Sequence, residues 1–401
     1  MTKTATAATT LRSLTRQAHT FRYGRPCDVT PLMHLIEDED ESFPCDDNAI
    51  AYHTGKLAWV ISTLDGGDHR IRVHDLRKQL TYEVDAAARS SVEVLAVSET
   101  ILGYVTTRGY CYAIAHSTRN SRRFRLPSSR VLHLSIRKSK ILLLFKIGSA
   151  SDVLLCKYDY DTGKAVDIKL ECRNHPTPGK PVKAFFRSSQ ETIFIFFERQ
   201  GLDSIHKILS VGEFSLDGLL LSPRFTDIAG FQDQWRACCN PASYDDLFTI
   251  TLEPSEETHW PYDTFEETIF QYNGSVDQVL VRKAVRPATN GKAEWGWSSM
   301  FPTIHPRFIW KDTMYAWSVN RDSRMLYASS LDGGTSSQGV NQCVALTYPA
   351  FASGQMVGQG GHREPHNFGD KFETLWLGGD SKFVFQIGQR ESYLWCFDKD
   401  F

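Results

Sequence analysis

The amino-acid sequence predicts an all-β protein, a β-propeller of about seven four-stranded blades, with six or eight blades also compatible with the pattern. Along most of the 401 residues, short runs rich in Val, Ile, Phe and Tyr alternate with turns rich in Gly, Asp, Ser and Pro. These runs come in groups of four within about 40 to 50 residues, which is the period of a propeller blade. One blade cannot cover both of its faces, so repeats of this kind must pack against one another.

The groups are regular in the first half of the chain and less regular afterwards. The first group begins with Ile50–Tyr52 and ends with Thr81–Val84, and three further groups follow it. We expect the fourth group to end with Leu219–Leu221 and the fifth to begin with Thr226–Ala229. This division leaves Val279–Ala284 as a spare strand before the sixth group.

The last group supplies only three strands, and we expect the N-terminal side of the chain to supply the fourth. Closed propellers are commonly completed in this way, and Thr30–Leu35 is the natural candidate. The predicted propeller domain therefore covers residues 27–401. Residues 1–26 are a basic lead-in, either a short helix over Thr10–His19 or a disordered segment. Their Thr, Ala and Arg content is also typical of a mitochondrial presequence.

The composition narrows the classes of partner and compartment. A hydrophobic share of 41% is enough for a large core, and a formal net charge of −2 gives no global attraction to nucleic acid or to a membrane surface. No apolar run reaches transmembrane length. The nine cysteines form no CxxC pair and mostly lie in apolar runs, which favours reduced, buried thiols and a cytoplasmic or nuclear compartment. We expect the protein to be a monomer.

Several expected strands end in an aromatic or His residue followed by Asp. The pairs are His74-Asp75, Tyr158-Asp159 and Phe397-Asp398. We expect the ring to pack between blades while the carboxylate accepts hydrogen bonds from the N–H groups of the following turn. This is a structural role, and we assign no catalysis to these residues.

Residue patterns that carry chemistry are scarce. His362 and His366 have helical spacing, but Pro365 between them and the glycines before them disfavour the helix that such a metal site needs. The segment Gly354–Gly361 lacks the Lys-Ser/Thr of a phosphate-binding loop. The sequence therefore predicts no catalytic residue, metal or cofactor. A propeller hydrolase or lyase, with ionisable side chains around the central channel, is the alternative function.

Two stretches are candidates for binding a protein partner. The first is basic and places Arg122, Arg123 and Arg125 near turns that share one rim, where an acidic peptide or nucleic acid could bind. Solvated hairpins are the alternative interpretation.

The second candidate stretch is rich in aromatic residues, and Trp and Tyr are favoured anchors at protein interfaces. For two of its tryptophans, at 295 and 297, packing between blades is an equally open interpretation. The expected contact residues are Trp235, Trp260, Tyr262, Trp295 and Trp297.

Three segments carry a resemblance to known families. The stretch Tyr158-Asp159-Tyr160-Asp161-Thr162-Gly163 resembles a degenerate WD repeat. The lead-in over residues 14–26, which ends in Gly24-Arg25-Pro26, and the closing strand Leu394–Asp398 are similar to the propeller regions of filamentous-fungal F-box proteins. This resemblance implies a protein–protein adaptor, the substrate-binding part of a ubiquitin-ligase receptor that works with Skp1 and cullin. That role depends on the helices of an F-box, and we find none in residues 1–26.

Overall fold

The structure is a computed structural model, and it describes sixteen segments of the chain. They are residues 28–31, 41–42, 49–63, 69–86, 90–127, 130–146, 153–171, 179–189, 191–202, 205–254, 266–285, 307–320, 323–331, 344–346, 374–388 and 392–397. The predicted lead-in over residues 1–26 lies outside them.

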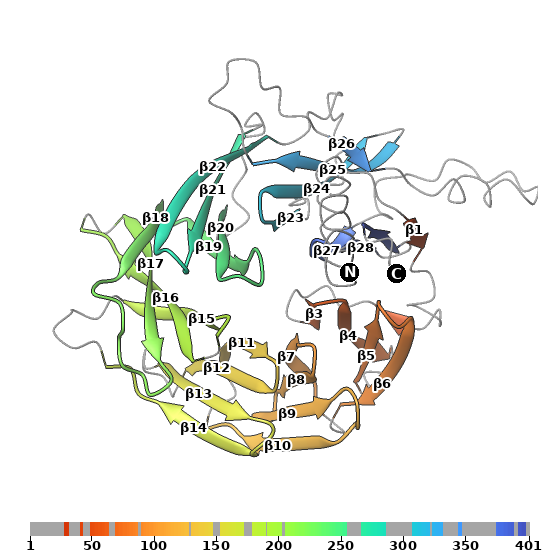
Figure 1. The fold of residues 1–401 in the computed structure, drawn as a ribbon, viewed down its shortest axis with the longest axis horizontal. Helices are drawn as coiled ribbons and strands as arrows, with labels where there is room; N and C mark the ends of the chain where they lie inside the picture. The colour runs from red at the N-terminus through yellow and green to blue at the C-terminus, as the bar shows by residue number, and fades with distance from the viewer. Residues whose placement is uncertain are drawn as a thin grey trace, which may run out of the picture. The chain divides into compact units, whose positions relative to one another are not determined.

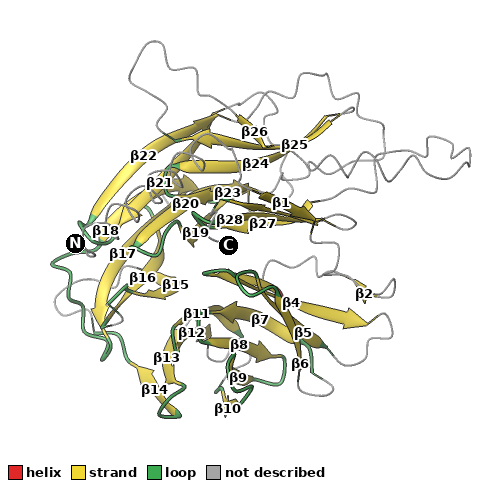
Figure 2. Cartoon of the chain, turned by 45° about the vertical axis from the view of Figure 1, so that its right-hand side comes forward, coloured by secondary structure: helices red, strands yellow, loops and turns green. Residues whose placement is uncertain are grey.

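The described part of the chain is an all-β propeller of antiparallel sheets, as predicted. Six of its sheets have four strands and one has five, and no described residue belongs to an α-helix (Figure 2). The number of sheets falls within the expected range of six to eight. Contacts divide the chain into two compact units, and each is described by itself. The larger unit holds residues 38–256 and 270–280, and the smaller unit holds the remainder.

Four sheets lie wholly in the larger unit (Figure 1). The first sheet consists of β2 (Glu41–Ser42), β3 (Ile50–His53), β4 (Lys56–Thr63), β5 (Arg70–Asp75) and β6 (Leu80–Asp85). The two short strands β2 and β3 both pair with β4. The second consists of β7 (Val92–Val97), β8 (Ile101–Thr106), β9 (Tyr110–Ala115) and β10 (Ser121–Arg125). The third consists of β11 (Val131–Arg137), β12 (Lys140–Lys146), β13 (Val153–Asp159) and β14 (Lys164–Ile168). The fourth consists of β15 (Lys180–Phe186), β16 (Thr192–Gln200), β17 (His206–Ser215) and β18 (Thr226–Gln232).

The three remaining sheets follow in the chain. The fifth consists of β19 (Trp235–Pro241), β20 (Leu247–Pro254), β21 (Glu266–Asn273) and β22 (Gln278–Val285). The sixth consists of β23 (Arg307–Trp310), β24 (Thr313–Asn320), β25 (Ser323–Ser330) and β26 (Val344–Leu346). The last contains β27 (Thr374–Gly379), β28 (Phe383–Gly388) and β29 (Ser392–Cys396).

A strand from the N-terminal side of the chain is the fourth strand of this last sheet. β1 (Asp28–Pro31) pairs antiparallel with β29, from Asp28 opposite Cys396 to Pro31 opposite Tyr393. The strand lies slightly before the segment Thr30–Leu35 that the sequence analysis proposed for this place. Residues far apart in the sequence thus form one ladder of hydrogen bonds.

Burial falls from the inner strands of each sheet to the outer strand, and this follows from the sequence. The run Ile141–Phe145 in β12 is apolar without interruption and is wholly buried, as expected for a strand covered on both faces. By contrast, β6, β10 and β14 contain no apolar run longer than two residues, and most of their residues are exposed. Each outer strand is therefore the part of its sheet that is available to partners.

Consecutive sheets of the larger unit enclose apolar clusters between their faces. One cluster joins the first and second sheets through Val73 and Leu102, and the next joins the second and third through Val105 and Leu143. The first strands β7, β11 and β15 lie next to one another (Figure 1). Stacking of this kind covers the faces that a single blade leaves open.

The division between the fourth and fifth blades differs from the sequence-based expectation. Residues 219–221 form no strand, because the chain turns at Gly218 (φ +90°) and folds back on Glu171 through the Leu220 N–H. A Cβ at Gly218 would lie 2.1 Å from the Lys169 carbonyl oxygen, so only glycine fits. The expected first strand of the fifth blade is instead β18, the outer strand of the fourth sheet, and the expected spare strand is β22.

Two of the three Asp residues predicted at strand ends, Asp75 and Asp159, bind the following turns as expected, and the third, Asp398, lies outside the described residues. Asp75 Oδ1 accepts hydrogen bonds from the N–H groups of Arg77 and Lys78 at 3.1 and 3.2 Å. Asp159 Oδ1 accepts them from the two residues after Tyr160, at 2.9 and 3.2 Å. Asp75 also pairs with Lys56. Burial acts to raise the pKa of Asp75, but Lys56 and the turn N–H groups outweigh it and hold this pKa below its usual value.

We expect Asp75→Ala to lower the free energy of unfolding by about 2 kcal/mol, because it removes charge-assisted hydrogen bonds and leaves Lys56 without its partner. Urea unfolding followed by circular dichroism measures this loss. Asp217→Ala, at an exposed turn of the fourth sheet, is the control and should change stability by less than about 0.5 kcal/mol. Equal midpoints for the two variants would contradict the turn-binding role of Asp75.

Candidate interaction surfaces

The three predicted arginines lie together on one outer strand. Arg122, Arg123 and Arg125 belong to β10, and all three are exposed. β10 pairs with β9 on one side, and in the described part of the chain no strand pairs with its other side. Phe124 anchors the strand by stacking on Tyr158 at a centroid separation of 4.4 Å. We call the exposed side chains of these three arginines the arginine surface.

Aromatic rings hold two of these guanidinium groups. The Arg122 guanidinium carbon lies 5.1 Å from the centroid of the Tyr160 ring, and its Nη1 donates to the Asp161 carbonyl at 3.4 Å. The Arg123 guanidinium carbon lies 5.7 Å from the centroid of the Tyr110 ring. Such cation–π contacts restrict the rotamers of otherwise flexible side chains. The arginine surface is therefore partly ordered before any partner binds.

The charge of β10 distinguishes it from the neighbouring outer strands. β6 carries Glu83 and Asp85, and β14 carries Lys164 together with Asp167. β10 has three cations and no acid.

Of the five aromatic residues predicted to contact a partner, only Trp235 lies in the described part of the chain. Trp235 begins β19, and its half-buried side chain packs against the apolar cluster between the fourth and fifth sheets. Trp260, Tyr262, Trp295 and Trp297 lie outside the described residues. The metal-spacing pair His362 and His366 also lies outside them.

A second group of polar residues connects the first hairpins of five sheets in the larger unit, and the sequence analysis did not find it. Tyr244, between β19 and β20, accepts a hydrogen bond from the Thr54 N–H at 2.9 Å through its hydroxyl. Its carbonyl accepts one from Arg137 Nη2 at 3.0 Å, and its ring packs edge-on against His53. The residues joined are 190 and 107 positions apart, so no local pattern could reveal them.

Ion pairs complete this hairpin network. His53 Nε2 lies 3.2 Å from a Glu99 carboxylate oxygen. Asp246 accepts hydrogen bonds from the Ser188 N–H and hydroxyl at 2.6 and 2.7 Å, and Arg187 Nε lies 3.4 Å from it. The His53 hydrogen bond lowers the pKa of Glu99 to about 2, although burial acts to raise it. A general acid needs a carboxyl pKa displaced in the opposite direction, so this geometry serves to fasten the hairpins together.

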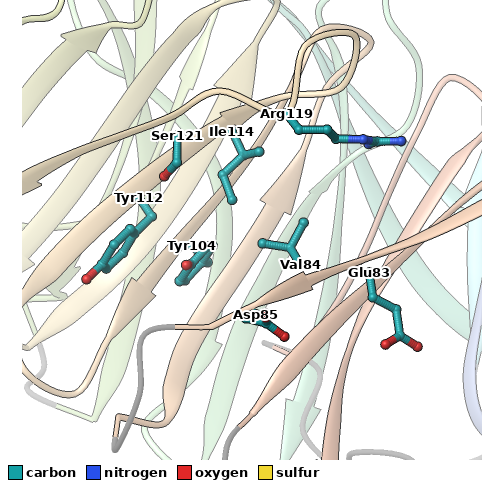
Figure 3. A pocket seen from close by; sticks show the side chains of 8 residues that line it. All are labelled: Glu83, Val84, Asp85, Tyr104, Tyr112, Ile114, Arg119 and Ser121. Atoms are coloured by element: carbon teal, nitrogen blue, oxygen red, sulfur yellow. The ribbon is translucent and has the colours of Figure 1, made fainter.

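A cavity of about 320 Å³ lies between the first and second sheets, at their outer strands (Figure 3). Its floor contains Tyr104 and Tyr112, whose rings stack at 4.9 Å with an interplanar angle of 6°. The complete lining is Glu83, Val84, Asp85, Tyr104, Tyr112, Ile114, Arg119 and Ser121. The signal available in the sequence was weak, because tyrosines that alternate along a strand are usually packing residues.

The described cysteines are free thiols, and the Cys238 Sγ donates a hydrogen bond to a Glu253 carboxylate oxygen at 3.0 Å. Cys111, Cys156, Cys239 and Cys396 are buried, and Cys238 is half-buried. Burial raises the pKa of Cys156, Cys238 and Cys239 to about 12, so these sulfurs stay protonated at neutral pH. Among the described residues, no group of three or more His, Cys, Asp or Glu side chains could hold a metal ion. The described segments contain no helix that is long and apolar enough to cross a bilayer.

Comparison with known proteins shows the fold only. No family model matches the sequence, and no curated protein matches it. A structure from the mitotic checkpoint complex is similar at 9% identity, with 92% of this chain and 91% of that chain covered and a TM-score of 0.47. The propeller domain of the Trilobed protease from Pyrococcus furiosus is similar at 11% identity, with 89% and 93% covered and a TM-score of 0.47. An oligogalacturonate lyase in complex with manganese is similar at 12% identity, with 86% and 87% covered and a TM-score of 0.44.

We expect Tyr244→Phe to lower the free energy of unfolding by about 1 kcal/mol, because the Thr54 N–H loses its acceptor. Thermal and urea unfolding both measure the change. The control is Tyr110→Phe, which removes a half-buried hydroxyl that has no hydrogen bond within the described residues. A control variant as destabilised as Tyr244→Phe would show that the hydroxyl bond does not fasten the hairpins.

The lowered pKa of Glu99 predicts a pH dependence of stability. Its carboxylate stabilises the folded state fully above the unfolded pKa of about 4.3, and this contribution is lost as pH falls toward the folded pKa of about 2. Because the side chain is 39% exposed, we discount the effect for solvent screening to about 1 kcal/mol. Between pH 6 and pH 3, Glu99→Gln should therefore lose less stability than the unchanged protein. An identical pH profile of the urea midpoint for both proteins would contradict this.

Proposed function

We propose that this chain is a protein-binding platform, and that its arginine surface binds an acidic segment of a partner protein. The observation that carries the proposal is the exposure of Arg122, Arg123 and Arg125 on a single outer strand that itself contains no acid. Guanidinium groups bind carboxylates through two parallel hydrogen bonds, so a row of them matches an acidic peptide.

The arrangement of β10 adds two physical advantages for binding. The contacts of Arg122 and Arg123 with tyrosine rings reduce the conformational entropy that is lost when a partner binds. The free edge of β10 presents backbone N–H and C=O groups, to which an extended peptide can add as a further strand. Affinity from the backbone and selectivity from the arginines then act on the same segment.

The finer proposal is that the propeller is the substrate-binding part of an F-box-type ubiquitin-ligase receptor that works with Skp1 and cullin. It follows from the resemblance of the lead-in and of the closing strand to propeller regions of filamentous-fungal F-box proteins. In such a receptor the arginine surface selects substrates, and a separate helical module recruits the ligase.

We expect a hexaglutamate peptide to bind the full-length protein, and the variant Arg122→Glu, Arg123→Glu, Arg125→Glu to bind it at least about tenfold more weakly. Fluorescence anisotropy with a labelled peptide at low and at physiological salt measures the affinity. The control is Lys78→Glu, Lys169→Glu, Arg224→Glu, which changes the net charge equally at exposed residues on the first, third and fourth blades. Equal weakening in both triple variants would assign the binding to net charge and overturn the proposed surface.

The receptor role has its own test. The tagged protein is purified from its source cells, and the proteins recovered with it are identified by mass spectrometry. Recovery of Skp1 and cullin supports the finer proposal. Partners that are lost in the arginine variant, recovered without Skp1 or cullin, support a free-standing adaptor instead.

A further inference from the structure

The cavity between the first and second sheets is continuous with one side of the arginine surface. Tyr104 in β8 lies opposite Tyr112 in β9, and Tyr112 lies opposite Arg123 in β10. Both tyrosines pack in the apolar cluster between the first and second sheets, so this row of three side chains faces the first sheet. Tyr104 is buried, Tyr112 is half-buried and Arg123 is exposed. The row therefore leads from the interior of the cavity to an exposed arginine.

The acids of β6 are directed away from this row. Glu83 and Asp85 border the cavity, but alternation along β6 places their carboxylates on the face opposite to Val84. Val84 pairs in register with Ile71 of β5, which packs in the cluster shared with the second sheet. Glu83 pairs in register with Arg72, and their side chains form an ion pair at 2.5 Å. The charge of Glu83 is therefore neutralised within the first sheet.

Two cations flank the entrance of the cavity. Arg119 and Arg123 stand two residues before and two residues after Ser121, an exposed residue of the lining. The Arg119 guanidinium carbon lies 3.0 Å from the centroid of the Tyr82 ring. Within the described residues neither arginine forms an ion pair. The entrance therefore attracts acidic groups.

The interior of the cavity suits an aromatic ring. Val84 from the first sheet and Ile114 from the second form apolar walls (Figure 3). The rings of Tyr104 and Tyr112 stack at 4.9 Å, and a further ring packs favourably beside such a pair in an offset or edge-on arrangement. The volume of about 320 Å³ holds one large side chain and is at the lower end of the range of roughly 300–1,000 Å³ for ligand pockets.

The Tyr104 hydroxyl determines which ring suits the cavity best. Within the described part of the chain it makes no hydrogen bond. An occupant that excludes water without offering a partner would leave this hydroxyl unsatisfied, which costs free energy. A phenol can donate to it or accept from it. A tyrosine side chain therefore combines ring packing with the missing hydrogen bond.

We propose that the cavity binds a tyrosine side chain of the acidic segment that the arginine surface binds. The inference rests on the proposed function and names the residue that makes the binding selective. The ring lies between Val84 and Ile114, and its hydroxyl pairs with that of Tyr104. Acids on either side of the tyrosine meet Arg119 and Arg123. The acids supply attraction during the approach, and the ring supplies the buried contact.

Five acetylated, amidated pentapeptides test the proposal with the full-length protein. Each has two glutamates on both sides of a central tyrosine, phenylalanine, leucine, glycine or phosphotyrosine, and isothermal titration calorimetry measures its affinity. We expect the tyrosine peptide to bind at least about tenfold more tightly than the glycine and leucine peptides, and about threefold more tightly than the phenylalanine peptide. The phosphotyrosine peptide should bind no more tightly than the glycine peptide, because its phosphate would be buried between apolar walls.

Three variants make the result specific. Tyr104→Phe should remove the difference between the tyrosine and phenylalanine peptides, because it removes the hydroxyl that only tyrosine can use. Ser121→Trp places an indole at the entrance and should reduce the affinity for the tyrosine peptide to that for the glycine peptide. The matched control Ser275→Trp, at an exposed turn of the fifth sheet, should change neither affinity. Thermal unfolding of each variant confirms that it is folded.

The outcomes separate this inference from the proposed function. Equal binding of the tyrosine, leucine and glycine peptides, lost in the triple variant Arg122→Glu, Arg123→Glu, Arg125→Glu, would overturn the tyrosine site and leave the arginine surface intact. Tightest binding of the phosphotyrosine peptide would assign the cavity to an anion and also overturn the inference. No binding of any peptide would overturn both proposals.

Discussion

The central strands β8, β12 and β16 are apolar on both faces along most of their length, and the rest of the larger unit depends on covering those faces. β12 illustrates the constraint, because its run from Ile141 to Phe145 has no polar side that could face water. The cost of exposing such a strand is removed when the next sheet packs on it. Gly103 shows how closely the second and third sheets approach, since an added Cβ would lie 2.5 Å from Ile136 Cδ1. The outer strands escape this requirement and are free to carry charge.

Polar interactions then fix how the stacked sheets are aligned. Apolar contacts between flat faces are not directional and leave some freedom to slide. The hairpin network supplies direction, because Tyr244 joins the first hairpins of the first, third and fifth sheets. Its ion pairs use side chains that would otherwise be available for chemistry. The ionisable residues of this network therefore serve to hold the hairpins together.

Binding capacity is left at the periphery, where the fold makes few demands. The two faces of β10 divide the arginine surface, because Arg122 lies on the face toward the third sheet, whereas Arg123 and Arg125 share the other face with Ser121, which lines the cavity. Arg122 contacts residues that follow β13 in the third sheet, whereas Ser121 faces β6 in the first. Alternation along β10 places these side chains on different faces of one short strand.

Local sequence determined the existence and type of most strands, the blade period and the turn-binding role of Asp75, because these depend on alternation and on hydrogen bonds within a few residues. It also brought Arg122, Arg123 and Arg125 together, since they are neighbours in one strand. It misplaced the strands after Leu219, because whether an apolar run pairs depends on the turn at Gly218 and on Glu171, far from it in sequence. Only the tertiary structure decided the Tyr244 contacts, which join hairpins of different sheets. Those features depend on which sheets pack together, and a one-dimensional pattern carries no information about distances between residues that are far apart in the chain.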